Sequence, residues 1–336
     1  MTMVAMLDFA SIEGVLCMPE AIDLLEKTLG HEARGSTSVS PKFTTEFKGG
    51  SMRVLFAADS DAGYCAMKAY HSIDGVGTRF VVLLYSLKDG ELLALIDGRP
   101  ITDLRTGAAS GVAARNVPLA GPVTIGLIGS GNQARTQLES LAAVYEVKSA
   151  AVYSPTVARR EAFAAEMSAK MGFPVTPVNS AEAAVRGRQV VATASNARSN
   201  EPVVRDEWLE DCRLLCAVGN TRRQFAEVDV ASFRRAGIVI VDSTHALEEA
   251  GELRQAIAAG ALPEKKRATL AQIVAGAASV PSEGLVVFKS VGTALQDLAL
   301  ATHYYEILAG RPGIVMAPNV AGLRGRAKAL DNIPAV

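Results

Sequence analysis

The chain has 336 residues, of which 49% are hydrophobic, and its 34 basic and 35 acidic side chains leave a net charge of −1. This composition excludes a disordered segment and is enough to bury a sizeable core in about two domains. The balanced charge argues against nucleic acid or a polybasic membrane surface as partner, and no apolar run reaches the ~18 residues of a membrane span. Four scattered cysteines and an N-terminus without a basic region favour a cytoplasmic protein with no disulfide framework, metal site or signal peptide.

The first 119 residues predict two helices separated by strands. Apolar residues at helical spacing predict a helix over residues 19–34, and an alanine-rich segment ended by Pro118 predicts another over residues 101–116. Turn signals such as Lys88-Asp89-Gly90 lie between them, because glycine supplies the positive φ that a tight turn needs. The turns separate four predicted strands, at residues 52–57, 63–70, 79–87 and 91–96.

From residue 123 onward, short apolar strands alternate with helices, which is typical of a parallel sheet covered on both faces. Strands are predicted at residues 123–128, 150–153, 175–178, 189–194, 213–218 and 238–241. Helices are predicted at residues 133–144, 157–171, 180–186, 228–235, 247–259 and 291–308, and the last is expected to return to the first domain. The predicted fold class is therefore α/β: a Rossmann domain with a doubly wound parallel sheet over residues 120–292, and a discontinuous α+β domain made of residues 1–119 and 293–336.

A glycine-rich fingerprint follows the first strand of the predicted Rossmann domain. It reads Gly129-Ser130-Gly131-Asn132-Gln133-Ala134 and opens the next helix. Gly129 permits a tight turn, Gly131 lets the backbone approach a pyrophosphate, and Ala134 lets the helix pack closely on the strand. The helix N-terminus then offers free N–H groups and a positive dipole end to phosphates. The motif in this strand–loop–helix context predicts a dinucleotide-binding site.

The choice of dinucleotide depends on the end of the second strand of that domain. Ser154 and Thr156 stand where an NAD-binding domain carries an acidic residue, and Arg159 and Arg160 follow closely. Hydroxyls and guanidinium groups suit the 2′-phosphate of NADP(H), so NADP(H) is favoured over NAD(H). The alternative is that the two arginines only solvate a helix face.

Two cationic residues are placed unfavourably for purely structural roles. Lys68 lies within an apolar predicted strand, where its charge is costly to bury unless an anion lies close. Arg105 lies near the start of a predicted helix, where the helix dipole disfavours a cation. Together they predict a site for a small carboxylate, with Arg105 as the bidentate partner.

The sequence resembles the ornithine cyclodeaminase/mu-crystallin family over nearly its full length. The resemblance rests on four motifs in order: Met67-Lys68, the segment 104–110, the fingerprint 127–134 and the segment 287–297. It implies an NAD(P)-dependent cyclodeaminase, amino-acid dehydrogenase or ketimine reductase, and a homodimer formed through the first, substrate-binding domain. It further implies that Lys68 contacts the substrate and gives a proton or hydrogen bond to an imine nitrogen, and that Arg105 holds the substrate carboxylate. The implied additional cofactor contacts are Gly219, Asn220, Val291 and Gly292.

Two departures from the family pattern concern the substrate site, and the second favours imine reduction. Lys42 follows Pro41 where the family commonly has an arginine. A lysine keeps the positive charge for a second contact to the substrate carboxylate but cannot make the bidentate hydrogen bonds of an arginine. Thr221 stands at or next to the position where cyclodeaminases and alanine dehydrogenases carry an aspartate. Amino-acid oxidation needs a base there, whereas reduction of a protonated imine does not, so the pocket is expected to lack a proton-abstracting carboxylate. Oxidative deamination would need a replacement base, for which Asp297 and Glu227 are the candidates.

The expected substrate-binding residues are Lys42, Lys68, Arg79, Arg105 and Thr221. Arg79 is included because an arginine on that strand, if it faces inward, would accept a second acidic group of the substrate. The preferred interpretation is an NAD(P)H-dependent reductase of a small cyclic or open-chain 2-imino acid, with Lys68 and Arg105 as catalytic residues. The alternatives are oxidative deamination of an amino acid and a non-catalytic NADPH-dependent ligand carrier.

Overall fold

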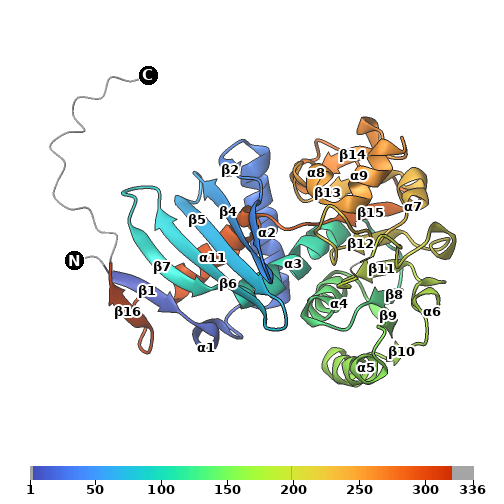
Figure 1. The fold of residues 1–336 in the computed structure, drawn as a ribbon, viewed down its shortest axis with the longest axis horizontal. Helices are drawn as coiled ribbons and strands as arrows, with labels where there is room; N and C mark the ends of the chain where they lie inside the picture. Colours follow the sequence, from blue (N-terminus) through green and yellow to red (C-terminus); the bar gives the residue numbers. More distant parts are fainter. Residues whose placement is uncertain (1–2, 198, 320–336) are drawn as a thin grey trace.

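Two eight-stranded sheets organise the computed structural model, which describes residues 3–197 and 199–319 (Figure 1). The first sheet is mixed, in the order β16-β1-β7-β6-β5-β4-β2, and β3 pairs with β4. The second is parallel, in the order β10-β9-β8-β11-β12-β15-β13-β14. This two-sheet α/β architecture confirms the predicted fold class. Residues 320–336, which the predicted first domain includes, lie outside the described residues.

The first sheet contains the four predicted strands as β4–β7, each with slightly shifted bounds. Its strands are β1 Met3–Leu7, β2 Thr37–Val39, β3 Phe43–Phe47, β4 Gly50–Asp59, β5 Tyr64–Ile73, β6 Gly77–Ser86, β7 Leu92–Asp97 and β16 Val315–Pro318. The strands β1, β2, β3 and β16 are additions that the sequence analysis missed. The helices of this lobe are α1 Phe9–Ile12, α2 Met18–Ala33, α3 Gly98–Arg115 and α11 Ala294–Leu308.

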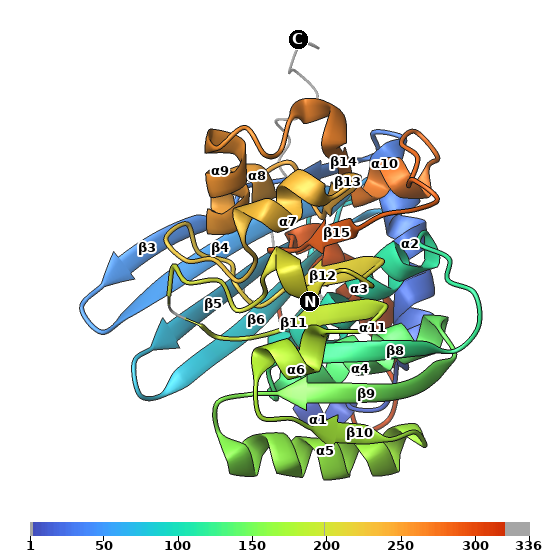
Figure 2. The same ribbon diagram turned by 90° about the vertical axis from the view of Figure 1, so that its right-hand side faces the viewer.

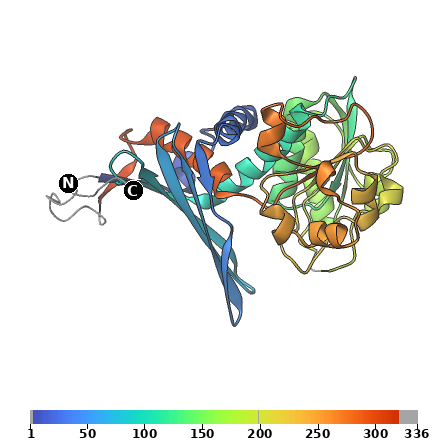
Figure 3. The ribbon, with the colours of Figure 1, turned by 90° about the horizontal axis from the view of Figure 1, so that it is seen from above.

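The strands of the first sheet have two unlike faces. In β4, Leu55 and Ala57 are buried. Phe56, which lies between them, is 44% exposed, and Met52 earlier in the strand is 46% exposed. Alternate residues of a strand point to opposite faces, and α11 packs on the face that carries Leu55. Figure 3 shows α2 and α11 on one side of this sheet. The face that carries Met52 and Phe56 therefore presents apolar side chains to solvent.

The second sheet contains all six predicted strands. Its strands are β8 Val123–Ile128, β9 Val147–Tyr153, β10 Val175–Pro177, β11 Val190–Thr193, β12 Leu214–Ala217, β13 Ile238–Val241, β14 Arg267–Thr269 and β15 Val286–Lys289. Figure 2 shows them in sheet order, from β10 at the bottom of the view to β14 at the top. Two strands were not predicted from the sequence: β15, which enters the sheet between β12 and β13, and β14 at the edge.

The helices of the second lobe alternate with its strands, except that β11 leads to β12 without an α-helix between them. They are α4 Asn132–Val144, α5 Val157–Met171, α6 Ala181–Val185, α7 Val230–Arg235, α8 Ala246–Glu249, α9 Gly251–Ala258 and α10 Leu270–Val274, with single 3-10 turns at Asp206–Trp208 and Glu264–Lys266. The helix predicted over residues 247–259 is broken at Ala250, which adopts an extended conformation between α8 and α9. No helix in the described part of the chain has both the length and the hydropathy that crossing a bilayer requires.

Helix α3 joins the two lobes. It packs against α4, where Gln137 donates to the carbonyl of Thr106 at 3.1 Å and Ser140 donates to that of Gly107 at 2.6 Å. One buried apolar cluster continues from β4–β7 through α3 and α4 into β8 and β11. This shared core fixes the inner face of the first sheet opposite the carboxyl ends of the second sheet's strands.

Candidate active site

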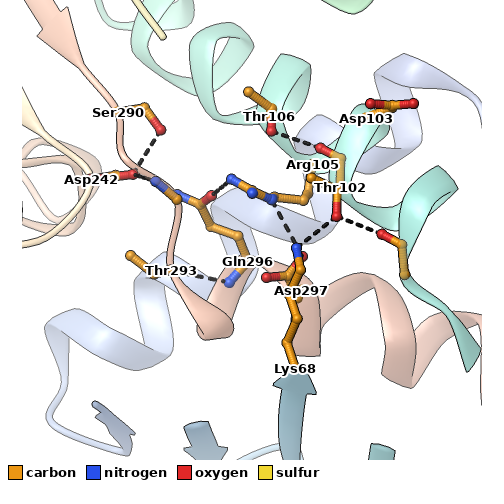
Figure 4. Close-up of polar contacts among 12 residues, drawn as sticks. Lys68, Thr102, Asp103, Arg105, Thr106, Asp242, Ser290, Thr293, Gln296 and Asp297 are labelled. Carbon is orange, nitrogen blue, oxygen red and sulfur yellow. Dashed lines mark hydrogen bonds and ion pairs between the residues drawn. The ribbon is translucent and has the colours of Figure 1, made fainter. Parts of the chain in front are cut away.

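A cavity of about 250 Å³ lies where the inner face of the first sheet meets the carboxyl ends of the parallel strands. One wall comes from β4, β5 and β6, and the other from the loops that follow β11, β12 and β15. Helices α3 and α11 contribute polar side chains, several of which Figure 4 shows. Doubly wound proteins bind ligands at this end of the sheet, so the cavity is the candidate active site.

Strand β5 places Lys68 on the wall of the cavity, where it is 2% exposed. Its Nζ donates to Asp297 Oδ1 at 2.7 Å and to Thr102 Oγ1 at 2.6 Å (Figure 4). Burial lowers the pKa of Lys68 to about 8, the charges of Arg105 and Lys42 add to the decrease, and the carboxylate of Asp297 opposes it. An ammonium group with a pKa close to neutrality is suited to proton transfer.

Helix α3 places the guanidinium of Arg105 on the cavity wall beside that lysine. Its Nη1 donates to Gln296 Oε1 at 2.8 Å, and its Nε lies 3.4 Å from Asp297 Oδ1 without a hydrogen bond to any described residue. Gly292 has a φ of +81°, and a Cβ at that position would lie 2.5 Å from Nη1. The guanidinium therefore occupies space that only glycine leaves open, and its remaining N–H groups are available to a substrate carboxylate.

Asp297, one of the two candidate replacement bases, lies in the cavity as the partner of its cations. The helix predicted from residue 291 begins at Ala294 with Thr293 as its N-cap, so Asp297 lies in the first turn of α11. It lines the cavity, is 1% exposed and pairs with both Lys68 and Arg105. The cost of burying Lys68 in an apolar strand is the sequence signal that points to such a partner.

The loop that joins β15 to α11 is held by Asp242, which the sequence analysis did not identify. Asp242 Oδ2 accepts hydrogen bonds from Ser290 Oγ at 2.7 Å, from the backbone N–H of Val291 at 2.9 Å and from that of Gly292 at 2.6 Å (Figure 4). Asp242 is 2% exposed and follows β13 directly. One carboxylate thus fixes the loop against which Arg105 packs.

Thr221 lies at the edge of the cavity, in the loop that follows β12. Gly219 and Asn220 of the same loop line the cavity too, and the carbonyl of Asn220 accepts from Lys289 Nζ at 2.5 Å. Glu227, one of the two candidate replacement bases, is fully buried beneath the loop and accepts from the backbone N–H of Asn220 at 2.7 Å. Glu227 is not among the residues that line the cavity, so its role is to shape the loop.

Lys42 lines the cavity but is already paired. Its Nζ donates to Glu249 Oε2 at 3.0 Å and to the carbonyl of Val291 at 3.2 Å. Its charge is therefore balanced by Glu249, and it connects the first lobe to α8 and to the loop after β15. A direct contact with the substrate stays a prediction.

Arg79, expected to contact the substrate if it faced inward, does not face this cavity. On β6, Thr78 and Phe80 line the cavity, whereas Arg79 between them is exposed and absent from the lining, because successive residues of a strand alternate between faces. The arginine that does reach the cavity from this sheet is Arg53 of β4, whose Cζ lies 5.6 Å from the ring centroid of Tyr70. In the sequence, Arg53 stands two residues before the apolar Leu55, a spacing that places both side chains on the same face of a strand.

The glycine fingerprint forms a loop that fits a dinucleotide. Gly129 has a φ of +116°, and a Cβ there would lie 2.5 Å from the carbonyl oxygen of Ala194. Gly131 is the N-cap of α4, provides no side-chain cap, and has no atom within 4 Å of its Cβ position. The first N–H groups of α4 therefore have open space for phosphate oxygens. Ala134 is fully buried between helix and sheet.

The side chains of the same turn are tied to α3. Asn132 and Gln133 donate to the two carboxylate oxygens of Asp103, at 3.3 and 2.7 Å, and Gln133 also lines the cavity. Ser130 Oγ donates to Ser154 Oγ at 2.9 Å, which links the turn to the end of β9.

The end of β9 separates the two neighbouring arginines. Arg160 is buried, donates to the carbonyl of Ser154 at 3.0 Å and to Asn179 Oδ1 at 2.8 Å, and lies over the ring of Tyr153. Arg159 and Thr156 are exposed at the start of α5. Arg160 therefore shapes the loop, and Arg159 is the cation free to meet a ligand.

Comparisons with known proteins extend over both lobes. Residues 2–311 match the model of the ornithine cyclodeaminase/mu-crystallin family. An alanine dehydrogenase of Archaeoglobus fulgidus is 31% identical over 304 residues, which cover 88% of this chain and 92% of that protein. A Delta(1)-pyrroline-2-carboxylate reductase of Bacillus cereus is 34% identical over 230 residues, which cover 67% and 70%. The solved Delta(1)-pyrroline-2-carboxylate reductase of Thermococcus litoralis, in complex with NADH and L-proline, is 30% identical with a TM-score of 0.84 and covers 90% of this chain and 97% of its own.

Proposed function

Because the chain belongs to the ornithine cyclodeaminase/mu-crystallin family, we propose that it reduces a small 2-imino acid to the L-amino acid with NAD(P)H. The observation that carries the proposal is the composition of the cavity. Lys68 and Arg105 lie together in it, and the loop after β12 presents Thr221 instead of a carboxylate. The similarity to reductases of a cyclic imino acid supports the same direction of reaction.

The chain's own residues would bind the substrate and move one proton. A bound nicotinamide supplies the hydride to the imine carbon. Arg105 would hold the carboxylate through the N–H groups that Gln296 does not use. Lys68 would donate a proton to the imine nitrogen, so that the C=N double bond becomes a CH–NH single bond, and would be reprotonated from solvent. Asp297 and Thr102 orient its Nζ for this transfer.

We propose that the dinucleotide lies along the turn 129–134 and the loops that contain Gly219, Asn220, Val291 and Gly292. NADP(H) is favoured over NAD(H), since Arg159 is exposed beyond β9 and hydroxyls of Ser154 and Thr156 replace a carboxylate there. A cytoplasmic location is inferred because all four cysteines are free thiols, as in a reducing compartment.

A second candidate function is oxidative deamination of an amino acid, or cyclodeamination of ornithine. One observation favours it: the carboxylate of Asp297 lies in the cavity, where a base would have to be. Against it, Asp297 Oδ1 is engaged by both Lys68 and Arg105. A base that removes a proton from an ammonium group needs a free lone pair directed at it.

The test is an absorbance assay of nicotinamide oxidation with purified protein. The substrates are a cyclic imino acid and open-chain imino acids formed from 2-oxo acids and ammonia, each with NADPH and with NADH. We expect turnover with imino acids and a lower KM for NADPH than for NADH. Absence of turnover with every imino acid, together with NAD-dependent release of ammonia from ornithine, would establish the second candidate. Binding of NADPH without any turnover would identify a ligand carrier.

We further propose a homodimer formed through the outer face of the first sheet. Phe43, Met52 and Phe56 are 55%, 46% and 44% exposed on or beside this face, and a hollow between Phe56, Met67 and Tyr85 lies among them. Contiguous exposed apolar surface of this kind marks an interaction site.

A further inference from the structure

The inner face of the first sheet presents its side chains to the cavity in rows. One row joins Leu55, Lys68 and Val82 across β4, β5 and β6. The next row, two residues further along each strand, joins Arg53, Tyr70 and Phe80, and the row after it includes Ser72 and Thr78. Two residues of strand span about 7 Å. The row of Arg53 therefore lies about 7 Å from the row that carries Lys68, the proposed proton donor.

Arg53 differs from the other cations that the structure places in this cavity. Lys68 pairs with Asp297, Lys42 pairs with Glu249, and Arg105 contacts Gln296 and Asp297. The guanidinium of Arg53 makes no hydrogen bond or ion pair with any described residue and lies over Tyr70.

The ring of Tyr70 connects the two rows. Arg53 Cζ lies 5.6 Å from the ring centroid and Lys68 Nζ lies 5.9 Å from it. Tyr70 is itself packed on Phe80, with centroids 5.2 Å apart. The aromatic pair thus supports the guanidinium in the row next to that of Lys68, and its N–H groups are left for a ligand.

Hydroxyl groups accompany this unpaired cation. Ser72 Oγ and Thr78 Oγ1 are 2.8 Å apart and both line the cavity in the row beyond Arg53. A fixed guanidinium beside two hydroxyls is a donor set that fits a carboxylate. A half-buried charge without a partner costs free energy that an anionic ligand would recover.

We propose that the preferred substrate is a short 2-imino dicarboxylic acid and that Arg53 binds its distal carboxylate; this inference rests on the proposed reductase function. Arg105 holds the carboxylate next to the imine carbon, and Lys68 donates the proton to the imine nitrogen. Arg53 determines the specificity for a substrate with a second carboxylate. The second acidic group that the sequence analysis assigned to Arg79 is thus assigned to the neighbouring strand.

The test compares two open-chain imino acids of equal chain length, one with a terminal carboxylate and one with a terminal methyl group. Both form in solution from the matching 2-oxo acids and ammonia. We expect the wild-type kcat/KM to be at least 10²-fold higher for the dicarboxylic substrate. In Arg53→Met the ratio of the two values should fall about 10²-fold, mostly through KM of the dicarboxylic substrate. Arg53→Lys, which keeps the charge and loses the fork, should lie between.

Arg79→Met is the matched control, because it removes the same charge from the opposite face of β6, and it should leave the ratio unchanged. The ratio is measured within one preparation, so partial misfolding of a variant does not alter it. A wild-type preference for the methyl-terminated substrate, or an unchanged ratio in Arg53→Met, would overturn the inference and leave the reductase function standing. Reduction of a cyclic imino acid but of neither open-chain substrate would overturn the inference alone, whereas no reduction of any of the three would refute both.

Discussion

At the scale of single residues, the chemistry of the site depends on the ammonium group of Lys68. It is buried in a strand, yet Asp297 and Thr102 satisfy it at 2.7 and 2.6 Å. Burial lowers its pKa to about 8, against the effect of Asp297. The same burial that makes the residue costly for stability makes its proton available near neutral pH.

The predicted pH dependence follows from that pKa. Lys68 is protonated below pH 8, so the rate of imine reduction should be high there and should fall as pH rises through about 8. Lys68→Arg should reduce kcat by about 10²–10⁴-fold, because a guanidinium holds its proton throughout this range. Stopped-flow or steady-state rates from pH 6 to about 10 measure both. If Lys68→Arg keeps the wild-type rate and the same alkaline decrease, the decrease belongs to another group and Lys68 is not the donor.

Single residues were also where sequence reasoning was least reliable. The cost of their placement predicted that Lys68 and Arg105 form one site, and the structure brings both to one cavity. The orientation of Arg79 could not be predicted, because a one-residue shift along a strand moves a side chain to the other face. For the same reason Arg53 was missed. Asp242 could not be found, since its partners are 48 to 50 positions away in the chain.

At the scale of elements, the loop between β15 and α11 is the part that connects the two walls of the cavity. Asp242 accepts three hydrogen bonds from it, and Arg105 packs on Gly292 within it. The predicted helix ran through this loop, and β15 was not predicted. Strand β15 has only four residues, all buried, so its sequence shows no alternation that would distinguish a strand from the start of the helix that follows. The strands β1 and β16 were missed for a related reason, because each is short and they pair with each other across most of the chain. Strand β3 forms a hairpin with β4, but all its residues are exposed, so it shows no alternation of apolar and polar residues.

Asp242→Asn tests whether this loop positions the substrate site. The amide keeps the size but weakens three charge-assisted hydrogen bonds, each of which contributes about 1.5–3 kcal/mol at most. We expect kcat/KM to fall about 10-fold or more, with KM for the imino acid rising because Arg105 loses its support. The melting temperature should fall by a few degrees, because the weakened bonds are made by a buried carboxylate. Dinucleotide affinity should fall less than imino-acid affinity, since the fingerprint at 129–134 makes no contact with Asp242. An unchanged KM would show that the loop does not position Arg105.

At the scale of the whole molecule, both sheets were predicted from the sequence. Six of the eight strands of the parallel sheet were among the predicted strands. Its apolar strands alternate with helices, and that pattern is local. The division into residues 120–292 and the remaining segments stays a prediction. The shared core through α3 and α4 could not be predicted, because it depends on how the two lobes pack against each other. The uncovered apolar face of the first sheet is a property of this larger scale too.

Phe56→Glu tests the proposed dimer. A charge in the centre of the exposed apolar face should cause dissociation to monomers, because it would be buried without a partner in the interface. Val157→Glu, on the second lobe at a residue that is 49% exposed, should leave the dimer intact. Sedimentation velocity distinguishes the two states. A monomeric wild type, or a dimeric Phe56→Glu variant, would place the interface elsewhere or remove it.

The central claim is that the missing aspartate after β12 directs the site toward reduction, and Thr221→Asp examines it most directly. The measurement is NAD(P)⁺-dependent ammonia release from ornithine and other L-amino acids, for wild type and variant, beside imino-acid reduction by both. We predict that wild type reduces imino acids and releases no ammonia, and that the variant gains measurable deaminase activity. Ammonia release by the wild-type protein at a rate comparable to its imine reduction would contradict the account.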